Sequence, residues 1–72
     1  MSEGKTIHVT VNGETIQTAE GRSVLEFLRT LELDPSRIAV ELDRNILKRP
    51  EWETTPLRDG ARLEVVQFVG GG

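Results

Sequence analysis

The fold is decided by residues 6–28, which read TIHVTVNGETIQTAEGRSVLEFL. Apolar and polar residues alternate from Thr6 to Val11, a pattern typical of a strand with one buried face. Asn12-Gly13 follows, and this dipeptide accepts the positive φ required at both central positions of a type I′ turn. The chain is therefore expected to return as a second strand from Glu14 to Thr18. Only Ile16 is strongly apolar in that strand, which favours a more exposed position at the edge of a sheet.

The same stretch ends in the start of a helix. Ser23 and Glu26 have the spacing of a capping box, in which each side chain accepts a hydrogen bond from a backbone N–H of the first turn. Apolar residues then recur at the spacing of one helical face, which predicts a helix that packs across the sheet. The residues on this face are Val24, Phe27, Leu28 and Leu31.

Beyond the helix the signals are shorter. Asp34-Pro35-Ser36 should stop the helical pattern, because the residue before a proline is pushed out of the α region. The segment from Ile38 to Leu42 is a predicted third strand, followed by a short extended piece at Ile46-Leu47. An irregular or single-turn segment is expected around 49–52, with its tryptophan covering one end of the core. Arg62 to Phe68 is the predicted last strand.

This order of elements predicts an α+β fold with a mixed sheet of four to five strands and one main helix on one face. A chain of 72 residues has room for one domain, which we assign to residues 1–72. Residues 69–72 are expected to form a flexible tail of Val-Gly-Gly-Gly that follows the last strand.

Composition argues against several classes of function. The chain has no cysteine and one histidine, and its carboxylates are scattered, so no catalytic triad or metal cluster can be assembled. A net charge of −3 makes nucleic acid a poor partner, because phosphate binding requires a basic surface. No long apolar run or apolar signal segment occurs, which predicts a cytoplasmic protein without a membrane anchor. We expect the isolated chain to be a monomer and not an enzyme.

The C-terminal glycines, Gly70 to Gly72, are the remaining candidate for function. A glycine-rich end alone fits a frayed terminus equally well. However, glycine has no Cβ, so such a tail can enter a narrow channel and let a partner's backbone approach the terminal carbonyl. The carboxylate of Gly72 would be ionised and unreactive at neutral pH, so a partner would have to activate it.

Strand alternation adds a candidate docking surface beside the tail. If the core-facing residues of the last strand are Leu63 and Val65, then Val66 and Phe68 lie on the outer face. Exposed apolar side chains beside charged ones are typical of docking surfaces. We therefore predict that partners dock on Val66, Phe68 and Val69.

The whole chain resembles the ThiS family, the sulfur carriers of thiamine thiazole biosynthesis, which have the ubiquitin-like β-grasp fold. The resemblance covers nearly all residues and is carried by short matches. These are the early Asn-Gly hairpin, the helix entry at 21–28, the segment Arg49-Pro50-Glu51-Trp52, and the closing stretch from Leu57-Arg58-Asp59-Gly60 to the glycine terminus. Lys48 departs from the proline usual before that Arg, and 42–45 departs from a usual Asn-Gly turn.

The resemblance implies a role for the terminus. A ThiF-like adenylyltransferase would use ATP and magnesium to adenylate Gly72, with Gly70 and Gly71 threading into its active site. A persulfide donor would then supply sulfur, and the resulting thiocarboxylate would deliver it to thiazole synthase. In this scheme the chain is a protein cosubstrate that binds no cofactor of its own.

Other functions remain open from the sequence. Related carriers that serve molybdopterin synthesis or tRNA thiolation look similar in fold and tail. A protein modifier that joins its terminus to a lysine of a target would carry the same glycines. A third alternative is a passive β-grasp interaction domain whose glycines have no role.

Overall fold

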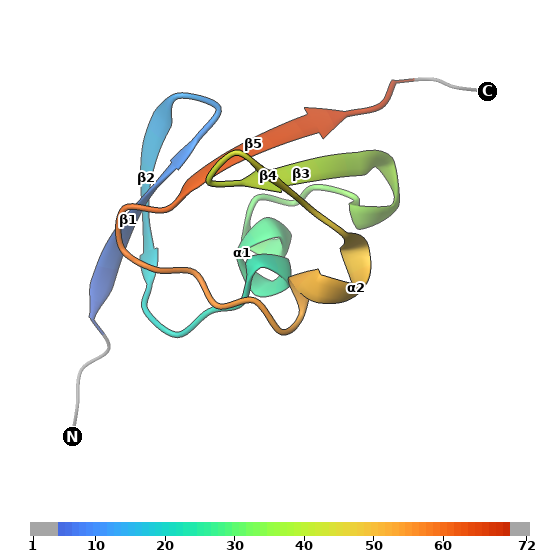
Figure 1. Ribbon diagram of the computed structural model, residues 1–72. Helices are drawn as coiled ribbons and strands as arrows, with labels where there is room; N and C mark the ends of the chain where they lie inside the picture. The colour runs from blue at the N-terminus through green and yellow to red at the C-terminus, as the bar shows by residue number, and fades with distance from the viewer. Residues whose placement is uncertain (1–4, 70–72) are drawn as a thin grey trace.

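The computed structural model describes residues 5–69, so Gly70 to Gly72, with most of the predicted tail, lie outside the described residues. Along the chain, a first β-hairpin is followed by the main helix, a second β-hairpin, a one-turn helix and a final strand (Figure 1). The strands are β1 Thr6–Val11, β2 Glu14–Ala19, β3 Ile38–Leu42, β4 Asn45–Leu47 and β5 Arg62–Gln67, and the helices are α1 Val24–Thr30, the 3₁₀ helix η1 Pro35–Arg37 and α2 Arg49–Trp52.

The five strands form one mixed sheet in the order β2-β1-β5-β3-β4. The last strand, β5, lies in the middle, parallel to β1 and antiparallel to β3. β2 is an edge strand, as its single strongly apolar residue indicated. The predicted α+β class with a mixed sheet and one main helix is confirmed.

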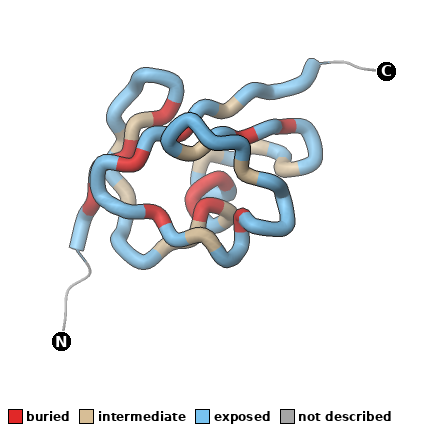
Figure 2. The backbone as a smooth tube through the Cα atoms, viewed as in Figure 1, coloured by how far each residue is buried: buried red, intermediate tan, exposed pale blue. Residues whose placement is uncertain are grey.

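The core lies between α1 and the inner face of the sheet, where the buried residues gather (Figure 2). The alternation of β1 buries every second residue, and α1 contributes three of the four residues predicted to face the core. The fourth, Leu31, is the half-buried C-cap. The buried apolar residues are Ile7, Val9, Val11, Val24, Phe27, Leu28, Ile38, Val40, Trp52, Leu57, Ala61 and Leu63.

Trp52 closes one end of this core. It is almost fully buried, and its indole Nε1–H donates a 2.9 Å hydrogen bond to the Leu47 carbonyl. The ring therefore buries its apolar body and satisfies its polar group at the same time. The predicted single-turn segment is confirmed as the one-turn helix α2, which begins with Pro50 near its start.

Local sequence explains the turns and the helix start. Asn12 and Gly13 both have positive φ, 49° and 86°, as a type I′ turn requires. The capping box is also present, because the Ser23 N–H donates to Glu26 Oε1 at 2.9 Å and the Glu26 N–H donates to Ser23 Oγ at 3.1 Å.

Several boundaries differ from the sequence prediction. The second strand runs one residue further, to Ala19, and the short strand β4 begins one residue earlier, at Asn45. The segment Pro35–Arg37 forms a 3₁₀ helix, because Asp34 caps it by accepting the Ser36 N–H at 3.0 Å and Pro35 occupies its first position. The last strand ends at Gln67, one residue earlier than expected, although the Phe68 N–H still donates to the Arg37 carbonyl at 2.7 Å.

Candidate functional site

The outer face of β5 leads directly to the C-terminal end of the chain. Glu64 and Val66 point away from the core, and the residues that follow Val66, which are Gln67, Phe68 and Val69, are also exposed. The exposed fractions of Val66, Phe68 and Val69 are 57%, 58% and 87%. The three residues predicted to dock partners are thus solvent-accessible apolar side chains on one continuous stretch.

Neighbouring strands extend this apolar surface. In the register of the sheet, Ala39 of β3 lies opposite Val66, and Glu41 lies between Glu64 and Ile46 of β4. Ile46 is 76% exposed. We call Ala39, Ile46, Val66, Phe68 and Val69 the apolar outer face.

Ile46 is a site candidate that the sequence did not reveal. A short extended piece was expected there, and β4 is indeed three residues long. Three residues are too few for alternation to show which side chain faces outward. The usable signal is the pairing with β3, since Ile46 lies opposite the outward-facing Glu41.

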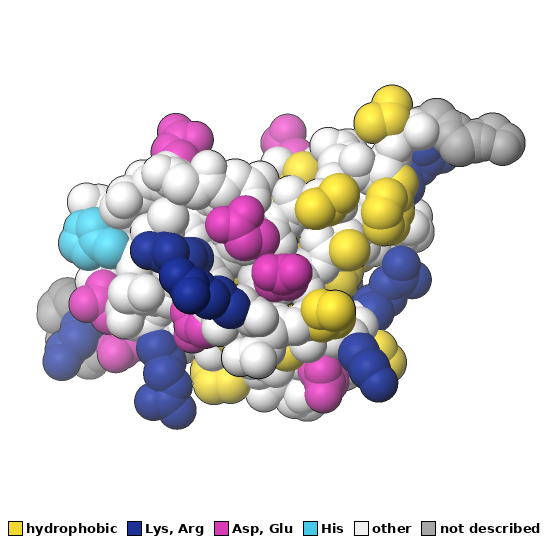
Figure 3. All heavy atoms as spheres, turned by 45° about the horizontal axis from the view of Figure 1, so that its top comes forward, with side chains coloured by type: hydrophobic (Ala, Val, Ile, Leu, Met, Phe, Trp, Pro, Cys, Tyr) yellow, Lys and Arg dark blue, Asp and Glu magenta, His cyan; other side chains and the backbone are white. Residues whose placement is uncertain are grey.

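The apolar outer face borders a band of charge. A shallow hollow of about 530 Å³ lies over β3, β4 and β5, and its walls include Glu41 and Glu64, then Arg44 and Arg62. Figure 3 shows hydrophobic side chains on the part of this face nearest the C-terminal end, with acidic and basic side chains beside them. A partner that fits this face would match an apolar patch and both signs of charge.

The chain is anchored to the sheet until shortly before its end. The hydrogen bond from the Phe68 N–H to the Arg37 carbonyl is the last backbone bond found among residues 5–69. Gly72 follows four residues later, which allows a reach of at most about 14 Å from that anchor.

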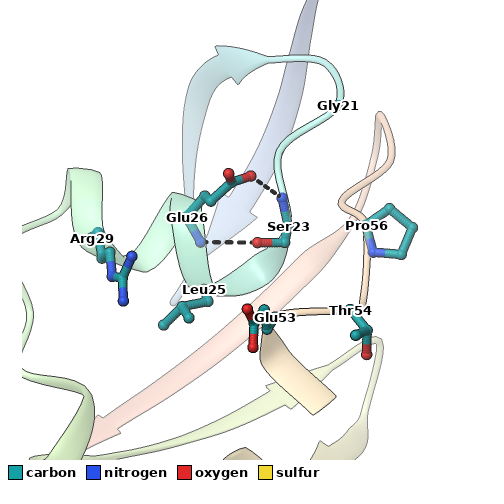
Figure 4. A pocket seen from close by; sticks show the side chains of 8 residues that line it. All are labelled: Gly21, Ser23, Leu25, Glu26, Arg29, Glu53, Thr54 and Pro56. Atoms are coloured by element: carbon teal, nitrogen blue, oxygen red, sulfur yellow. Dashed lines mark hydrogen bonds between the residues drawn. The ribbon is translucent and has the colours of Figure 1, made fainter. Parts of the chain in front are cut away.

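A second hollow, of about 590 Å³, lies beside the start of α1 (Figure 4). Its polar groups include Ser23 and Glu26, which already bond each other in the capping box. Arg29 and Glu53 at its rim are exposed to solvent. We assign no function to this hollow, because its polar groups are satisfied locally or hydrated.

Other candidate chemistry is sparse in the part of the chain that the structure describes. His8 is exposed, with its Nδ1 3.7 Å from Asp59 Oδ1 and its Nε2 3.3 Å from the Gln17 amide nitrogen. Among residues 5–69 there is no group of three histidine or acidic side chains placed to hold a metal ion. None of the described helices has the length and apolar character needed to cross a membrane.

The five-stranded mixed sheet, the helix across its inner face and the central last strand define a ubiquitin-like protein of the β-grasp class. Its C-terminal strand ends beside an apolar outer face. The ThiS family model matches residues 4–72, and the chain belongs to this family.

Several known proteins are similar to the chain. The crystal structure of the thiamine biosynthesis protein ThiS from Geobacter metallireducens is 33% identical, with a TM-score of 0.75, and the match covers 92% of this chain and all of that one. The sulfur carrier protein ThiS of Escherichia coli is 26% identical over 92% of this chain and its own full length. Thiazole synthase of Paramagnetospirillum magneticum is 32% identical over 86% of this chain, but only 19% of that protein is matched.

Proposed function

We propose that this chain is a sulfur carrier in thiamine biosynthesis and that its working group is the carboxylate of Gly72. The observation that carries the proposal is the extent of the family match, which runs through the glycine terminus to the last residue. The sulfur carrier of Escherichia coli is similar over its full length. The chain would act as a protein cosubstrate, because activation and sulfur transfer belong to its partners.

The chemistry follows from the state of the carboxylate. An ionised carboxylate does not accept a sulfur nucleophile, so a ThiF-like adenylyltransferase would join it to the α-phosphate of ATP, with magnesium as counterion and pyrophosphate as leaving group. The terminal sulfur of a persulfide would then attack the carbonyl carbon and displace AMP. Cleavage of the remaining S–S bond by a thiol would leave a thiocarboxylate at Gly72.

This chain's own residues supply position and recognition. The anchor at Phe68 fixes where the tail leaves the sheet, and the short reach to Gly72 limits where the carboxylate can go. Gly70 and Gly71 would pass through a narrow partner channel because they carry no side chains. The apolar outer face, including Val66, Phe68 and Val69, would dock against the partner.

The sulfur acceptor would be thiazole synthase. In the thiazole synthase of Paramagnetospirillum magneticum a segment similar to this chain forms part of the enzyme itself. The thiazole synthase of Magnetococcus marinus also contains a segment similar to this chain, with 31% identity over 86% of this chain. Such an arrangement supports a functional pairing between a carrier of this type and that enzyme.

The test is mass spectrometry of the chain after incubation with ATP, magnesium, a ThiF-like enzyme and a persulfide donor. We expect a species in which one oxygen at Gly72 has been replaced by sulfur. A chain lacking Gly71 and Gly72 should give no such species, whereas Thr15→Ala, on the distant strand β2, should give the normal yield. An unchanged mass, obtained with partners that thiolate an established carrier, would refute the proposal.

A denaturing gel of a cell lysate distinguishes the carrier function from the function of a protein modifier. A modifier joins its terminus to lysine through an isopeptide bond and leaves stable heavier bands in a cell lysate. We expect only the free chain, because the thiocarboxylate is consumed by sulfur transfer.

A further inference from the structure

The backbone of β5 has one paired side and one side that is only partly paired. Successive residues of a strand direct their N–H and C=O groups to opposite sides. The Arg62 carbonyl accepts the Asp43 N–H at 2.8 Å, and the Phe68 N–H donates to the Arg37 carbonyl at 2.7 Å. Even-numbered residues of β5 therefore pair with the β3 side, and odd-numbered residues face the side of β1.

On the side of β1 the partners run out before β5 ends. The Leu63 carbonyl accepts the Asn12 N–H at 2.9 Å, the last backbone bond from the β1 hairpin. At the next residue on this side, the Asn12 side chain makes the hydrogen bonds that a neighbouring strand would otherwise make. Its Oδ1 accepts the Val65 N–H at 2.8 Å, and its Nδ2 donates to the Val65 carbonyl at 3.1 Å.

Gln67 is the next residue on this side. Gln67 lies opposite Ile38 of β3, but by this alternation its N–H and carbonyl point away from β3. Among residues 5–69, no hydrogen bond beyond the strand ladder reaches either group. The residue is exposed, and Figure 1 shows β5 running on past the hairpin of β1 and β2. An unpaired strand edge of this kind is a template for pairing with another chain.

We propose that the partner which activates Gly72 pairs an extended backbone segment of its own with the open edge of β5 at Gln67. The inference deepens the proposed carrier function and rests on it. The open edge lies five residues before the carboxylate, so it is continuous with the part of the chain that the partner must hold. Backbone pairing suits this task, because glycines offer a partner no side chains to recognise.

The hydrogen bonds that β5 already makes also limit where a partner's backbone can pair with it. Arg37 already occupies the β3 side of the strand at Phe68, and Asn12 closes the opposite side as far as Val65. In the complex, the same alternation would extend the paired side to residue 69. A second copy of this chain would offer only the same single free residue in return, which is too little paired backbone to hold a stable dimer.

The test compares two substitutions at Gln67 in ATP–pyrophosphate exchange by the activating enzyme. Gln67→Pro removes the N–H, and the fold should tolerate it because that N–H makes no bond in the free chain and Val66 is already extended. Gln67→Ala keeps the backbone groups and removes only the side chain. We expect the KM for the carrier to rise by about tenfold for Gln67→Pro, because one desolvated hydrogen bond is lost. The KM for Gln67→Ala should stay near the wild-type value.

Equal KM values for Gln67→Pro and wild type would overturn the inference. An equal rise for both variants would also overturn it, since the side chain would then carry the recognition.

If Gln67→Pro does not fold, amide hydrogen exchange on the wild-type chain decides. The Gln67 N–H should exchange fast in the free chain and slowly with the enzyme bound, whereas the bonded Phe68 N–H should be slow in both. Fast exchange of the Gln67 N–H in the complex would refute the pairing. Wild-type chain that is not adenylated at all would instead contradict the carrier function.

Discussion

At the scale of single residues, Asn12 performs two tasks that usually require different residues. Its backbone adopts the positive φ of the hairpin turn, and its side chain makes both hydrogen bonds to Val65. Asparagine suits both, because it tolerates the left-handed region and its amide carries a donor and an acceptor side by side. The residue thus connects the first hairpin to the last strand.

Asn12→Gly should destabilise the protein by about 1–2 kcal/mol, because glycine keeps the backbone geometry while both side-chain hydrogen bonds are lost. Urea denaturation measures the change. Asn45→Ala is the matched control, since the Asn45 side chain makes one 3.2 Å bond to the Asp43 carbonyl on the surface. That control should cost less than about 0.5 kcal/mol. Equal losses in the two variants would show that Asn12 does not connect the hairpin to β5.

The fold lowers the pKa of Asp34, at the start of the 3₁₀ helix η1. The hydrogen bond from the Ser36 hydroxyl, 2.8 Å long, lowers the pKa of Asp34, with smaller contributions from the Ser36 N–H and from Arg37. A depressed pKa in the folded state means that Asp34 stabilises the fold above its unfolded pKa. This contribution is lost as the pH falls through the folded pKa.

Ser36→Ala should therefore raise the pKa of Asp34 toward its ordinary value, and Ser36→Thr, which keeps the hydroxyl, should leave it low. Titration of the Asp34 carboxyl by NMR measures both. The prediction is wrong if the alanine and threonine variants titrate at the same pH.

At the scale of elements, the second hairpin has a turn that its sequence does not favour. Asp43 and Arg44 both have positive φ, 50° and 74°, which matches a type I′ geometry without glycine. Asparagine and aspartate tolerate the left-handed conformation, but for another residue with a Cβ, such as Arg44, it costs roughly 1–2 kcal/mol. The antiparallel pairing of β3 with β4 maintains the turn against this cost.

Arg44→Gly should raise the stability by about 0.5–1 kcal/mol, because glycine adopts this φ without strain. Thermal denaturation measures the gain as a higher Tm. Arg44→Ala removes the same charge but keeps a Cβ, so it should give no gain. A similar rise in both variants would attribute the effect to charge and refute the strain argument.

Elements whose signals are local were predictable from the sequence. The alternation of β1, the Asn-Gly turn and the capping box of α1 each depend on neighbouring residues, and the structure confirms them. The placement of β5 between β1 and β3 depends on pairs 52 residues apart with β1 and 21 to 29 residues apart with β3, which no local pattern encodes. The exposure of Ile46 and the partial pairing of β5 depend on this order, so they required the structure.

At the scale of the whole molecule, the proposed function divides between the tail and the face beside it. Ile46→Ser together with Val66→Ser should raise the KM of the activating enzyme for the carrier, because both side chains belong to the apolar outer face. The fold should be little affected, since each side chain is more than half exposed. Steady-state kinetics and a thermal melt measure the two effects.

Thr15→Ala controls for the position of the change, because Thr15 lies in the edge strand β2, at the other end of the sheet. The control should keep the wild-type KM. If the double variant also keeps it, the partner does not use the apolar outer face, although the role of Gly72 would be unaffected.

The central position of β5 also affects the order in which the protein can fold during synthesis. Synthesis proceeds from the N-terminus, so β5 leaves the ribosome after every other strand, yet the sheet cannot close until β5 lies between β1 and β3. Until β5 is available, β1 and β3 have no strand between them, so the two hairpins cannot join into one sheet.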